Sequence, residues 1–396
     1  MSLAGSQAQT FLRLLRQLRP HWRTDVNLPR RIQALLAGER AFGSRDRRLY
    51  RELIYATLRY LPWIEPLLDE GGANPAQTEE AIRRIAHLAA ETPATRAFRS
   101  EFATGALPQG DKAELLPAWF RAHCPEAFEP AQLDTLLARA PLWVRILDSD
   151  TEHIEGSLAQ DRIAVIGRSP VLPTAWRLPE DANVAHSAAY QDGLVEIQDL
   201  GSQLILASVG VKSGERWLDA CAGAGGKTLQ LASLVGPGGR VTAHDIRAAA
   251  LEELRLRAER TRLGNIAVTP KIEGQFDGVL VDAPCSGSGT WRRAPHLKWI
   301  TKESDIAAAA AKQAELLAKF AAHVQPGGRL VYATCSLSGR ENEEVVAAFL
   351  RAHADFEAAP FAETFGFSVR DGGITILPAR HDTDGFFVAS LRRRRS

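Results

Sequence analysis

The sequence is poor in cysteine and lacks any long hydrophobic run. Only 4 of its 396 residues are Cys, far too few for the disulfide framework of a small secreted protein. No apolar run approaches the ~20 residues needed to cross a bilayer. Arginines are spread through the N-terminal segment, and no small-residue cleavage site follows an apolar core, so we predict no signal peptide. We therefore expect a cytoplasmic protein that makes no membrane contact.

The chain also has almost no net charge, since 48 Lys and Arg residues face 47 Asp and Glu residues. This balance would argue against nucleic-acid binding, but the charge is unevenly distributed. Residues 1–60 hold twelve Arg and only four acidic residues, a local excess of eight positive charges. Forty of the 48 basic residues are Arg, a side chain that binds phosphate through paired hydrogen bonds and stacks on bases. A GC-rich coding bias would produce the same excess.

Hydrophobic periodicity divides the chain into three regions. Apolar residues recur at helical spacing over most of 1–135, which predicts an all-α domain with a basic face. Short β-branched runs, LWVRIL, RIAVIG and LVEIQDL, predict a small α+β module over 136–205. Strand-like and helix-like runs then alternate over 206–396. This alternation is typical of an α/β domain with a parallel sheet covered by helices on both faces.

A glycine-rich turn follows the first strand of the predicted α/β domain, in LDACAGAGGKT. Such a turn lets a ligand approach the backbone closely, although a tight strand-to-helix connection also uses glycine. The phosphate-binding loop G-x-x-x-x-G-K-[ST] would need glycine at Cys221, so that motif is absent. The second strand ends at Asp245, the position of the ribose ligand in doubly wound nucleotide folds. Together these features favour a cofactor that carries a nucleoside over a nucleoside triphosphate.

Two cysteines follow two further strands, Cys285 in DAPCSGSG and Cys335 in ATCS. Open α/β sheets bind ligands at the carboxyl ends of their strands, so both thiols are candidates for chemistry. A thiolate needs nearby positive charge at neutral pH, which Lys227 and the helix N-termini at this edge could supply. A zinc site is the weaker interpretation, because no CxxC or spaced His pair is present. Cys124 and Cys221 are interpreted as small buried apolar residues.

Three motifs of the predicted α/β domain resemble those of a known family. LDACAGAGGKT, DAPCSGSGTWRR followed by P and KW, and YATCS followed by ENEE are similar to the Nop/Sun family of RNA 5-methylcytosine methyltransferases. Within that family the sequence resembles the bacterial ribosomal RNA small-subunit methyltransferase B group. The resemblance implies a Rossmann-like core that uses S-adenosylmethionine, a NusB-like N-terminal RNA-binding domain and an RRM-like middle module. It also implies RNA, above all rRNA, as the partner; we expect a monomer.

The resemblance also assigns roles to residues of this sequence. Cys335 would attack carbon 6 of cytosine and Cys285 would help release the product, while Asp282 would hold the base and Lys227 would lie beside it. The cofactor-binding residues would be Ala220, Cys221, Ala222, Gly223, Ala224, Gly225, Gly226, Lys227, Asp245, Arg247 and Asp282. The expected RNA-binding residues are Arg45, Arg47 and Arg48 of the basic N-terminal region, with Arg293 and Lys298 of the RR-P-KW extension. Packing of that loop is the alternative for Arg293 and Lys298. No metal is expected.

The sequence departs from the family pattern near the cofactor. Ala224 stands where the family usually has Pro, and the segment 264–276 is short and lacks the Asp that usually lies near adenine. The short segment suggests one alternative, a catalytically weakened RNA-binding assembly factor. A tRNA cytosine-5 methyltransferase and a DNA cytosine methyltransferase also stay open. In a DNA enzyme the cysteine after Pro would attack, so Cys335 and the N-terminal resemblance argue against that alternative.

Overall fold

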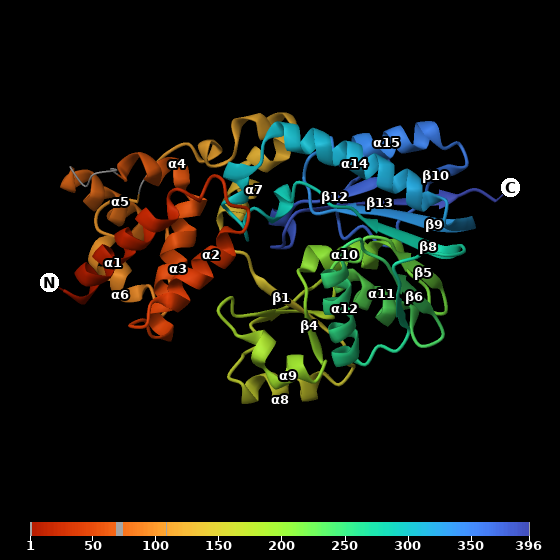
Figure 1. The fold of residues 1–396 in the computed structure, drawn as a ribbon, viewed down its shortest axis with the longest axis horizontal. Helices are drawn as coiled ribbons and strands as arrows, with labels where there is room; N and C mark the ends of the chain where they lie inside the picture. Colours follow the sequence, from red (N-terminus) through yellow and green to blue (C-terminus); the bar gives the residue numbers. More distant parts are fainter. Residues whose placement is uncertain (1, 69–73, 108, 396) are drawn as a thin grey trace. The chain divides into compact units, whose positions relative to one another are not determined.

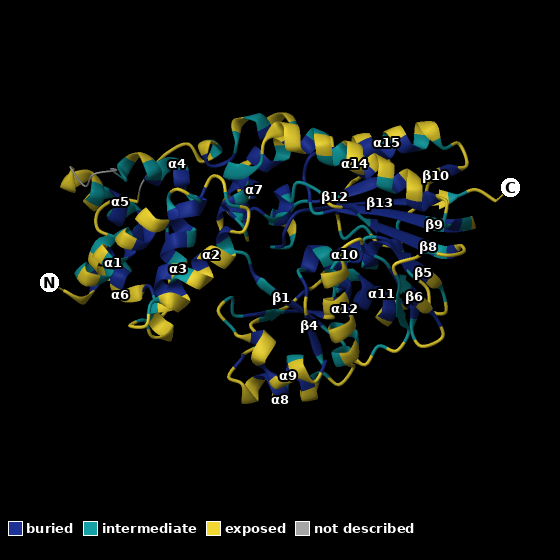
Figure 2. Ribbon diagram, in the orientation of Figure 1, coloured by how far each residue is buried: buried dark blue, intermediate teal, exposed yellow. Residues whose placement is uncertain are grey.

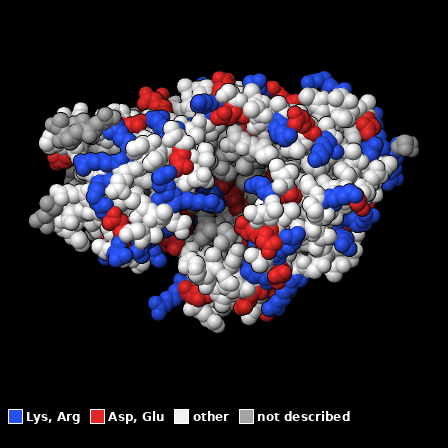
Figure 3. All heavy atoms as spheres, viewed as in Figure 1, with Lys and Arg blue, Asp and Glu red and all other residues white. Residues whose placement is uncertain are grey.

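The computed structural model describes residues 2–68, 74–107 and 109–395. The chain forms two compact units, each with its own core. We call residues 1–139 with 291–302 the helical unit and residues 140–290 with 303–396 the sheet unit. No described helix is long and apolar enough to cross a membrane. On the face shown in Figure 3, Lys and Arg side chains are interspersed with Asp and Glu.

The helical unit contains α-helices and short 3-10 turns, as its apolar periodicity predicts (Figure 1). Amphipathic helices pack their apolar stripes together, and Phe11, Leu53 and Ile85 are completely buried where they do so. Its helices are α1 (Leu3–Leu18), α2 (Leu28–Gly38), α3 (Ser44–Arg59), α4 (Leu61–Ile64), α5 (Pro75–Leu88), α6 (Arg96–Phe102), α7 (Pro130–Leu137) and α13 (Leu297–Ile300).

The first part of the sheet unit is a small α+β module. Its four-stranded antiparallel sheet has the order β2-β3-β1-β4. The elements are β1 (Leu142–Ile146), α8 (Thr151–Gln160), β2 (Gly167–Arg168), β3 (Ala175–Leu178), α9 (Ala188–Gln191) and β4 (Val195–Ile197). The prediction of a strand over RIAVIG is wrong for most of that run, since only its last residue belongs to β2. Ile163 is instead buried against Leu158 as the chain leaves α8, so burial outside a ladder explains its apolar character.

The rest of the sheet unit is built on a nine-stranded sheet. Strands β9, β8, β5, β6 and β7 are neighbours and run parallel, whereas β13, β12, β11 and β10 pair antiparallel beside them. The strands are β5 (Arg216–Asp219), β6 (Arg240–Ala243), β7 (Ile266–Val268), β8 (Phe276–Asp282), β9 (Val324–Thr334), β10 (Phe356–Ala358), β11 (Val369–Arg370), β12 (Gly373–Ile376) and β13 (Phe386–Arg393). This confirms the predicted α/β architecture.

Helices cover both faces of this sheet (Figure 1). One face carries α10 (Leu200–Val209), α11 (Gly226–Val235) and α12 (Ala248–Thr261), and the other carries α14 (Glu303–Ala321) and α15 (Glu343–Ala352). Figure 2 shows the result: the central strands are buried, while α14 and α15 turn exposed residues outward. The three layers make a Rossmann-like domain, in which the carboxyl ends of the parallel strands meet at one edge.

The segment Trp291–Lys302 belongs to the helical unit, although its place in the sequence lies inside the predicted α/β domain. Lys298 Nζ donates to the carbonyl of Arg59 at 2.8 Å, and Trp299 Nε1 donates to the carbonyl of Leu58 at 2.8 Å. These carbonyls end α3 and have no partner within the helix. The KW pair therefore caps a helix that lies more than two hundred residues earlier in the chain, a long-range contact that local sequence patterns do not show.

Candidate functional site

A cavity of about 830 Å³ opens in the sheet unit where β5, β6, β8 and β9 end. Every residue predicted to be catalytic or to bind the cofactor lines it: Ala220, Cys221, Ala222, Gly223, Ala224, Gly225, Gly226, Lys227, Asp245, Arg247, Asp282, Cys285 and Cys335. The remaining lining residues were not predicted, and they are Ser202, His244, Ile246, Ala283, Pro284, Thr290, Lys312, Glu315, Leu316, Lys319, Phe320 and Phe386.

The glycine-rich turn has a backbone that other residues rarely adopt. Gly223 and Gly225 have φ values of +54° and +93°, and a Cβ on Gly225 would lie 2.7 Å from Leu254 Cγ. Gly225 is also the N-cap of α11, and the first residues of that helix, Gly226 and Lys227, line the cavity. The turn thus offers hydrogen-bond donors and the positive end of a helix to a ligand carboxylate.

Asp245 follows β6 and is held as a charged acceptor. It accepts hydrogen bonds from the N–H of Gly223 at 2.8 Å and from the N–H and guanidinium of Arg247. Burial acts to raise the pKa of Asp245, but the hydrogen bonds from Arg247 and Gly223 outweigh it and keep that pKa below its usual value. A carboxylate at this strand end suits the two hydroxyls of a ribose.

Apolar side chains line the cavity next to Asp245, and they could hold an adenine ring. Ile246 is 91% exposed, which is unusual for a large apolar residue, and it lines the cavity together with Leu316 and Phe320 from α14. The acid that the family usually carries after β7 is missing, but Ile246 and Leu316 offer apolar surface to a flat ring, while Phe320 is 2% exposed and supports them from the core. Ile246 could have been found from sequence as the residue after the strand-end acid; Leu316 and Phe320 carried no such signal.

The two candidate thiols lie against each other. Cys285 Sγ and Cys335 Sγ are 3.2 Å apart, because each follows one of the adjacent parallel strands β8 and β9. The hydrogen bond to Cys335 and burial raise the pKa of Cys285 well above its ordinary value, so Cys285 keeps its proton at neutral pH. Its S–H can then donate to Cys335. Among the described residues no cluster of His, Cys, Asp and Glu could hold a metal ion.

Lys227 and Asp282 form an ion pair beside the thiols, with Nζ and Oδ2 2.8 Å apart. Burial acts to lower the pKa of Lys227, but Asp282 and the neighbouring Cys335 raise it, and the net result is a raised pKa. Lys227 therefore stays positively charged within electrostatic reach of Cys335. An ammonium in this position stabilises a thiolate.

A buried carboxylate, Glu341, ties the two cysteine loops together. It is completely buried and accepts from the N–H of Ser286 at 2.8 Å, Ser286 Oγ at 2.6 Å and Ser336 Oγ at 2.5 Å. Gln313 Nε2 of α14 donates to it at 3.0 Å. Since Ser286 follows Cys285 and Ser336 follows Cys335, this one side chain fixes both thiol-bearing turns. The sequence singled out ENEE only as part of a resemblance and gave Glu341 no role.

Asp219, at the end of β5, lies beneath the same cavity. Burial raises its pKa to about 7, and Thr228 Oγ1 donates to it at 2.7 Å. Because the folded protein holds this proton more tightly than the unfolded chain, stability falls as the pH rises from about 4 to about 7 and then levels off. A shift of this size corresponds to as much as about 4 kcal/mol.

Replacing Asp219 by Asn should remove this pH-dependent loss. The amide oxygen of the new side chain still accepts from Thr228, and no buried charge has to form. We expect the Asp219→Asn protein to gain stability relative to the wild type as the pH is raised from 5 to 8, measured by urea unfolding. An equal stability difference at both pH values would show that Asp219 titrates in the same way in the folded and unfolded states.

Two predicted positions have other surroundings than expected. Cys221 was expected to be a buried apolar residue, but it is only partly buried and lines the cavity. Burial still raises the pKa of its thiol to about 12, so the thiol is inert, as expected. Lys298 was expected at an RNA-binding surface, but it is buried, it caps α3, and burial lowers its pKa well below the usual value. The prediction that Lys298 contacts RNA is therefore wrong, and its side chain stabilises the end of α3 instead. Arg45, Arg47, Arg48 and Arg293 are exposed, so their predicted RNA contact stays a prediction.

The small α+β module is joined to the glycine-rich turn through Arg257 of α12. Its guanidinium donates to Glu196 of β4 at 2.9 Å and to the carbonyl of Ala224 at 2.6 Å. Arg260 also pairs with Glu196, whose side chain is buried. The two guanidinium partners compensate the charge of the buried carboxylate, and the two bonds of Arg257 connect β4 and the glycine-rich turn to one helix.

Comparison with known proteins agrees with this geometry. The family model described as 16S rRNA methyltransferase RsmB/F matches residues 206–392. The ribosomal RNA small subunit methyltransferase B of Serratia proteamaculans is 31% identical over 89% of this chain and 92% of that protein. The probable ribosomal RNA small subunit methyltransferase B of Bacillus subtilis is 35% identical over 71% of this chain and 66% of that protein.

Solved structures are similar over large parts of the chain. A methyltransferase homologue from Pyrococcus horikoshii is 26% identical, with a TM-score of 0.58 over 69% of this chain and 93% of its own. The crystal structure of PH0851 is 23% identical, with a TM-score of 0.77 over 99% of this chain and 100% of its own, and shows that the fold is shared. Since the match to the Serratia protein extends over most of both chains, this chain belongs to the 16S rRNA methyltransferase RsmB/F family.

Proposed function

We propose that the protein is an S-adenosylmethionine-dependent methyltransferase that modifies carbon 5 of a cytosine in small-subunit rRNA. The observation that carries this proposal is the pair of thiols 3.2 Å apart beside the Lys227–Asp282 ion pair, in the cavity that also contains the glycine-rich turn. Relatives named as ribosomal RNA small subunit methyltransferases support rRNA over tRNA as the substrate.

The residues of the site suit the cofactor. Gly223, Gly225 and the N-terminus of α11 would receive its carboxylate, Asp245 its ribose and Ile246 one face of its adenine. Bound there, S-adenosylmethionine supplies an electrophilic methyl group on a sulfonium. The apolar side chains around Ile246 also weaken the alternative of a catalytically impaired assembly factor, which depended on a poor adenine site. A protein that bound rRNA but no S-adenosylmethionine in calorimetry would restore that alternative.

Cytosine carbon 5 is a poor nucleophile, and the protein must activate it. The Cys335 thiolate, stabilised by the Lys227 ammonium and the Cys285 S–H, adds to carbon 6 of the ring and forms a carbon–sulfur bond. The electron pair of the 5,6 double bond is displaced towards carbon 5 and the pairing edge. Asp282 can accept a hydrogen bond from the cytosine amino group and so fix the ring over Cys335.

Carbon 5 then takes the methyl group and must lose its proton before the covalent bond to the enzyme breaks. Removal of that proton by a base restores the double bond and expels the Cys335 thiolate. Cys285 lies against the departing sulfur, where its proton can neutralise the thiolate as it leaves. The target base has to be unpaired or flipped out of a helix, because both ring faces are covered when it is stacked.

Release of tritium from carbon 5 tests the proposal directly. Small-subunit rRNA transcribed with cytosine labelled at carbon 5 should lose one tritium to water for each methyl group gained when wild-type protein and S-adenosylmethionine are added. The same rRNA labelled at carbon 5 of uracil should lose none and is the control. Methyl transfer without tritium release would move the reaction to another atom of the RNA, and no methyl transfer would overturn the proposed activity.

A further inference from the structure

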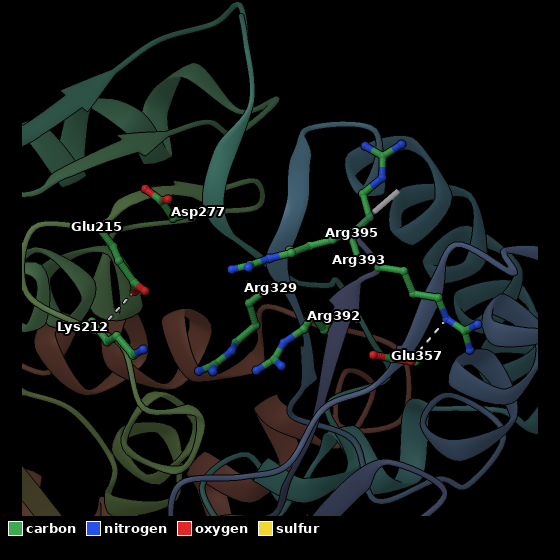
Figure 4. A pocket seen from close by; sticks show the side chains of 10 residues that line it. Lys212, Glu215, Asp277, Arg329, Glu357, Arg392, Arg393 and Arg395 are labelled. Carbon is green, nitrogen blue, oxygen red and sulfur yellow. Dashed lines mark hydrogen bonds and ion pairs between the residues drawn. The ribbon is translucent and has the colours of Figure 1, made fainter.

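A second cavity, of about 570 Å³, lies in the sheet unit outside the site described above (Figure 4). Its lining is rich in positive charge and comprises Lys212, Glu215, Asp277, Gly327, Arg329, Glu357, Arg392, Arg393, Arg394 and Arg395. Lys212 and Glu215 precede β5, and Asp277 lies at the start of β8, so the cavity lies at the amino ends of the parallel strands. The catalytic cavity lies at their carboxyl ends.

The acidic residues of this second cavity are already engaged. Glu215 accepts from the N–H of Lys212 and from Trp217 Nε1, both at 2.9 Å. Asp277 accepts from the N–H of Arg216 and from Gln325 Nε2 at 2.8 and 2.7 Å. The third carboxylate, Glu357, forms an ion pair with Arg394. These bonds occupy both oxygens of Asp277 and one oxygen each of Glu215 and Glu357.

Two arginines face each other across neighbouring strands. Arg329 of β9 and Arg392 of β13 are register partners in an antiparallel pair, and like charges directly opposite destabilise a sheet. Arg329 is partly buried, and burial together with the nearby Arg392 lowers its pKa although Glu215 acts to raise it. Figure 4 shows the two side chains extending in the same direction. A bound anion would relieve this repulsion.

Two further cations complete the cluster. Arg395 lies over Gly327, where a Cβ would come within 2.8 Å of its Nε, so the glycine lets the guanidinium lie close to the backbone. Lys212 is exposed at the opposite wall. Among the described residues, no carboxylate forms an ion pair with Lys212, Arg392 or Arg395. Guanidinium groups in such a cluster match phosphate oxygens through paired hydrogen bonds.

We infer that this cavity binds the phosphodiester backbone of the substrate RNA at a position remote from the methylated base. The inference rests on the proposed function, which makes RNA the polyanion that the protein meets. Arg329 and Cys335 are six positions apart in the sequence, or about 20 Å of extended strand at about 3.3 Å per residue. Only an RNA that extends well beyond the target cytosine can therefore reach both cavities.

Fluorescence anisotropy with small-subunit rRNA fragments shortened stepwise towards the methylated cytosine tests this inference. The test variant is Arg392→Gln with Arg395→Gln, both at exposed positions, with folding checked by thermal melting. For the longest fragments we expect about tenfold weaker binding near 0.15 M salt. The slope of log affinity against log salt should flatten by about 1.5, since two lost phosphate contacts release fewer counterions. For the shortest fragment the affinity should match that of the wild type.

The matched control removes two exposed arginines of the same unit that lie outside the cavity. Arg255→Gln with Arg351→Gln changes the net charge equally and should leave the affinity and the salt slope unchanged. An equal loss in test and control variants, or no loss for long fragments, would overturn the inference. So would binding of phosphatidylserine vesicles that the test variant alone abolishes while RNA affinity is retained.

Failure of this inference is distinguishable from failure of the proposed function. If the function is wrong, the wild type releases no tritium from cytosine-labelled rRNA, whatever its RNA affinity. If only the inference is wrong, the wild type releases tritium, but the Arg392→Gln, Arg395→Gln protein binds every fragment as tightly as the wild type does.

Discussion

Replacing Cys335 by alanine should abolish methyl transfer, with kcat reduced by at least about a thousandfold. The reason is that no other group is placed to make the bond to carbon 6. Cys221 is inert, and burial and the nearby Glu341 carboxylate still act to raise the pKa of Cys285 after the hydrogen bond to Cys335 is lost. Cys285→Ala should behave differently, because the attack by Cys335 remains possible while release is slowed. We expect that variant to accumulate a covalent protein–RNA adduct that survives denaturing gel electrophoresis and disappears on nuclease digestion.

The cysteine of the helical unit supplies the control. Cys124 is buried and far from β8 and β9 in the sequence, so Cys124→Ala should retain turnover and form no adduct. The double variant Cys285→Ala, Cys335→Ala should also form none. Full activity in Cys335→Ala, or an adduct in the double variant, would refute the assignment of Cys335 as the nucleophile. An adduct in Cys335→Ala alone would instead identify Cys285 as the attacking thiol, as in the DNA methyltransferase alternative.

Glu341→Gln should lower kcat by about a hundredfold while leaving the affinity for S-adenosylmethionine unchanged. The buried carboxylate accepts four hydrogen bonds from Ser286, Ser336 and Gln313, and a hydrogen bond to a charged group contributes about 1.5–3 kcal/mol. The amide replaces one acceptor oxygen by a donor that faces other donors, so the two cysteine turns lose their common anchor. Glu341 does not line the cofactor cavity, which separates its effect from cofactor binding.

Measurements on adduct formation would distinguish a positioning role from a general loss of structure. In the Cys285→Ala background, adding Glu341→Gln should slow adduct formation about as much as it slows turnover, while calorimetry still detects cofactor binding. Glu344→Gln is the matched control, since Glu344 belongs to the same ENEE motif but is exposed; it should be silent in both assays. Equal loss of cofactor affinity and turnover in Glu341→Gln would mean that the sheet unit as a whole had been disturbed.

Much of the site could be predicted because its signals are local. The glycine-rich turn, Asp245 and the two cysteines each follow a strand, and the carboxyl ends of parallel strands must meet at one edge of a sheet. The prediction that these residues lie at one edge therefore did not require knowledge of the strand order. The same reasoning could not find Leu316 and Phe320, because they belong to a helix whose amphipathic pattern explains them equally well as packing residues.

The role of ENEE shows a different limit. Its residues are close in sequence to Cys335 but not to Ser286, and only the pairing of β8 with β9 brings both turns around Glu341. Asn342 takes part as well, since its Oδ1 accepts from Thr334 and its Nδ2 donates to the carbonyl of Ser336. The sequence does not show that Glu341 is buried, nor that it lacks a basic partner. The four hydrogen bonds that compensate its burial are formed only in the folded protein.

The sequence by itself determined the α/β class, the edge of the sheet at which the cavity opens and the two thiols that line it, because strand–helix alternation and strand-end residues are short-range features. Tertiary structure decided which charges face solvent, ligand or protein. Lys298, which the sequence assigned to RNA binding, is a buried cap on α3, whereas Arg329 and Arg392, 63 positions apart in the sequence, are cross-strand neighbours. Burial and pairing set the role of a charged side chain, and both depend on contacts between distant parts of the chain.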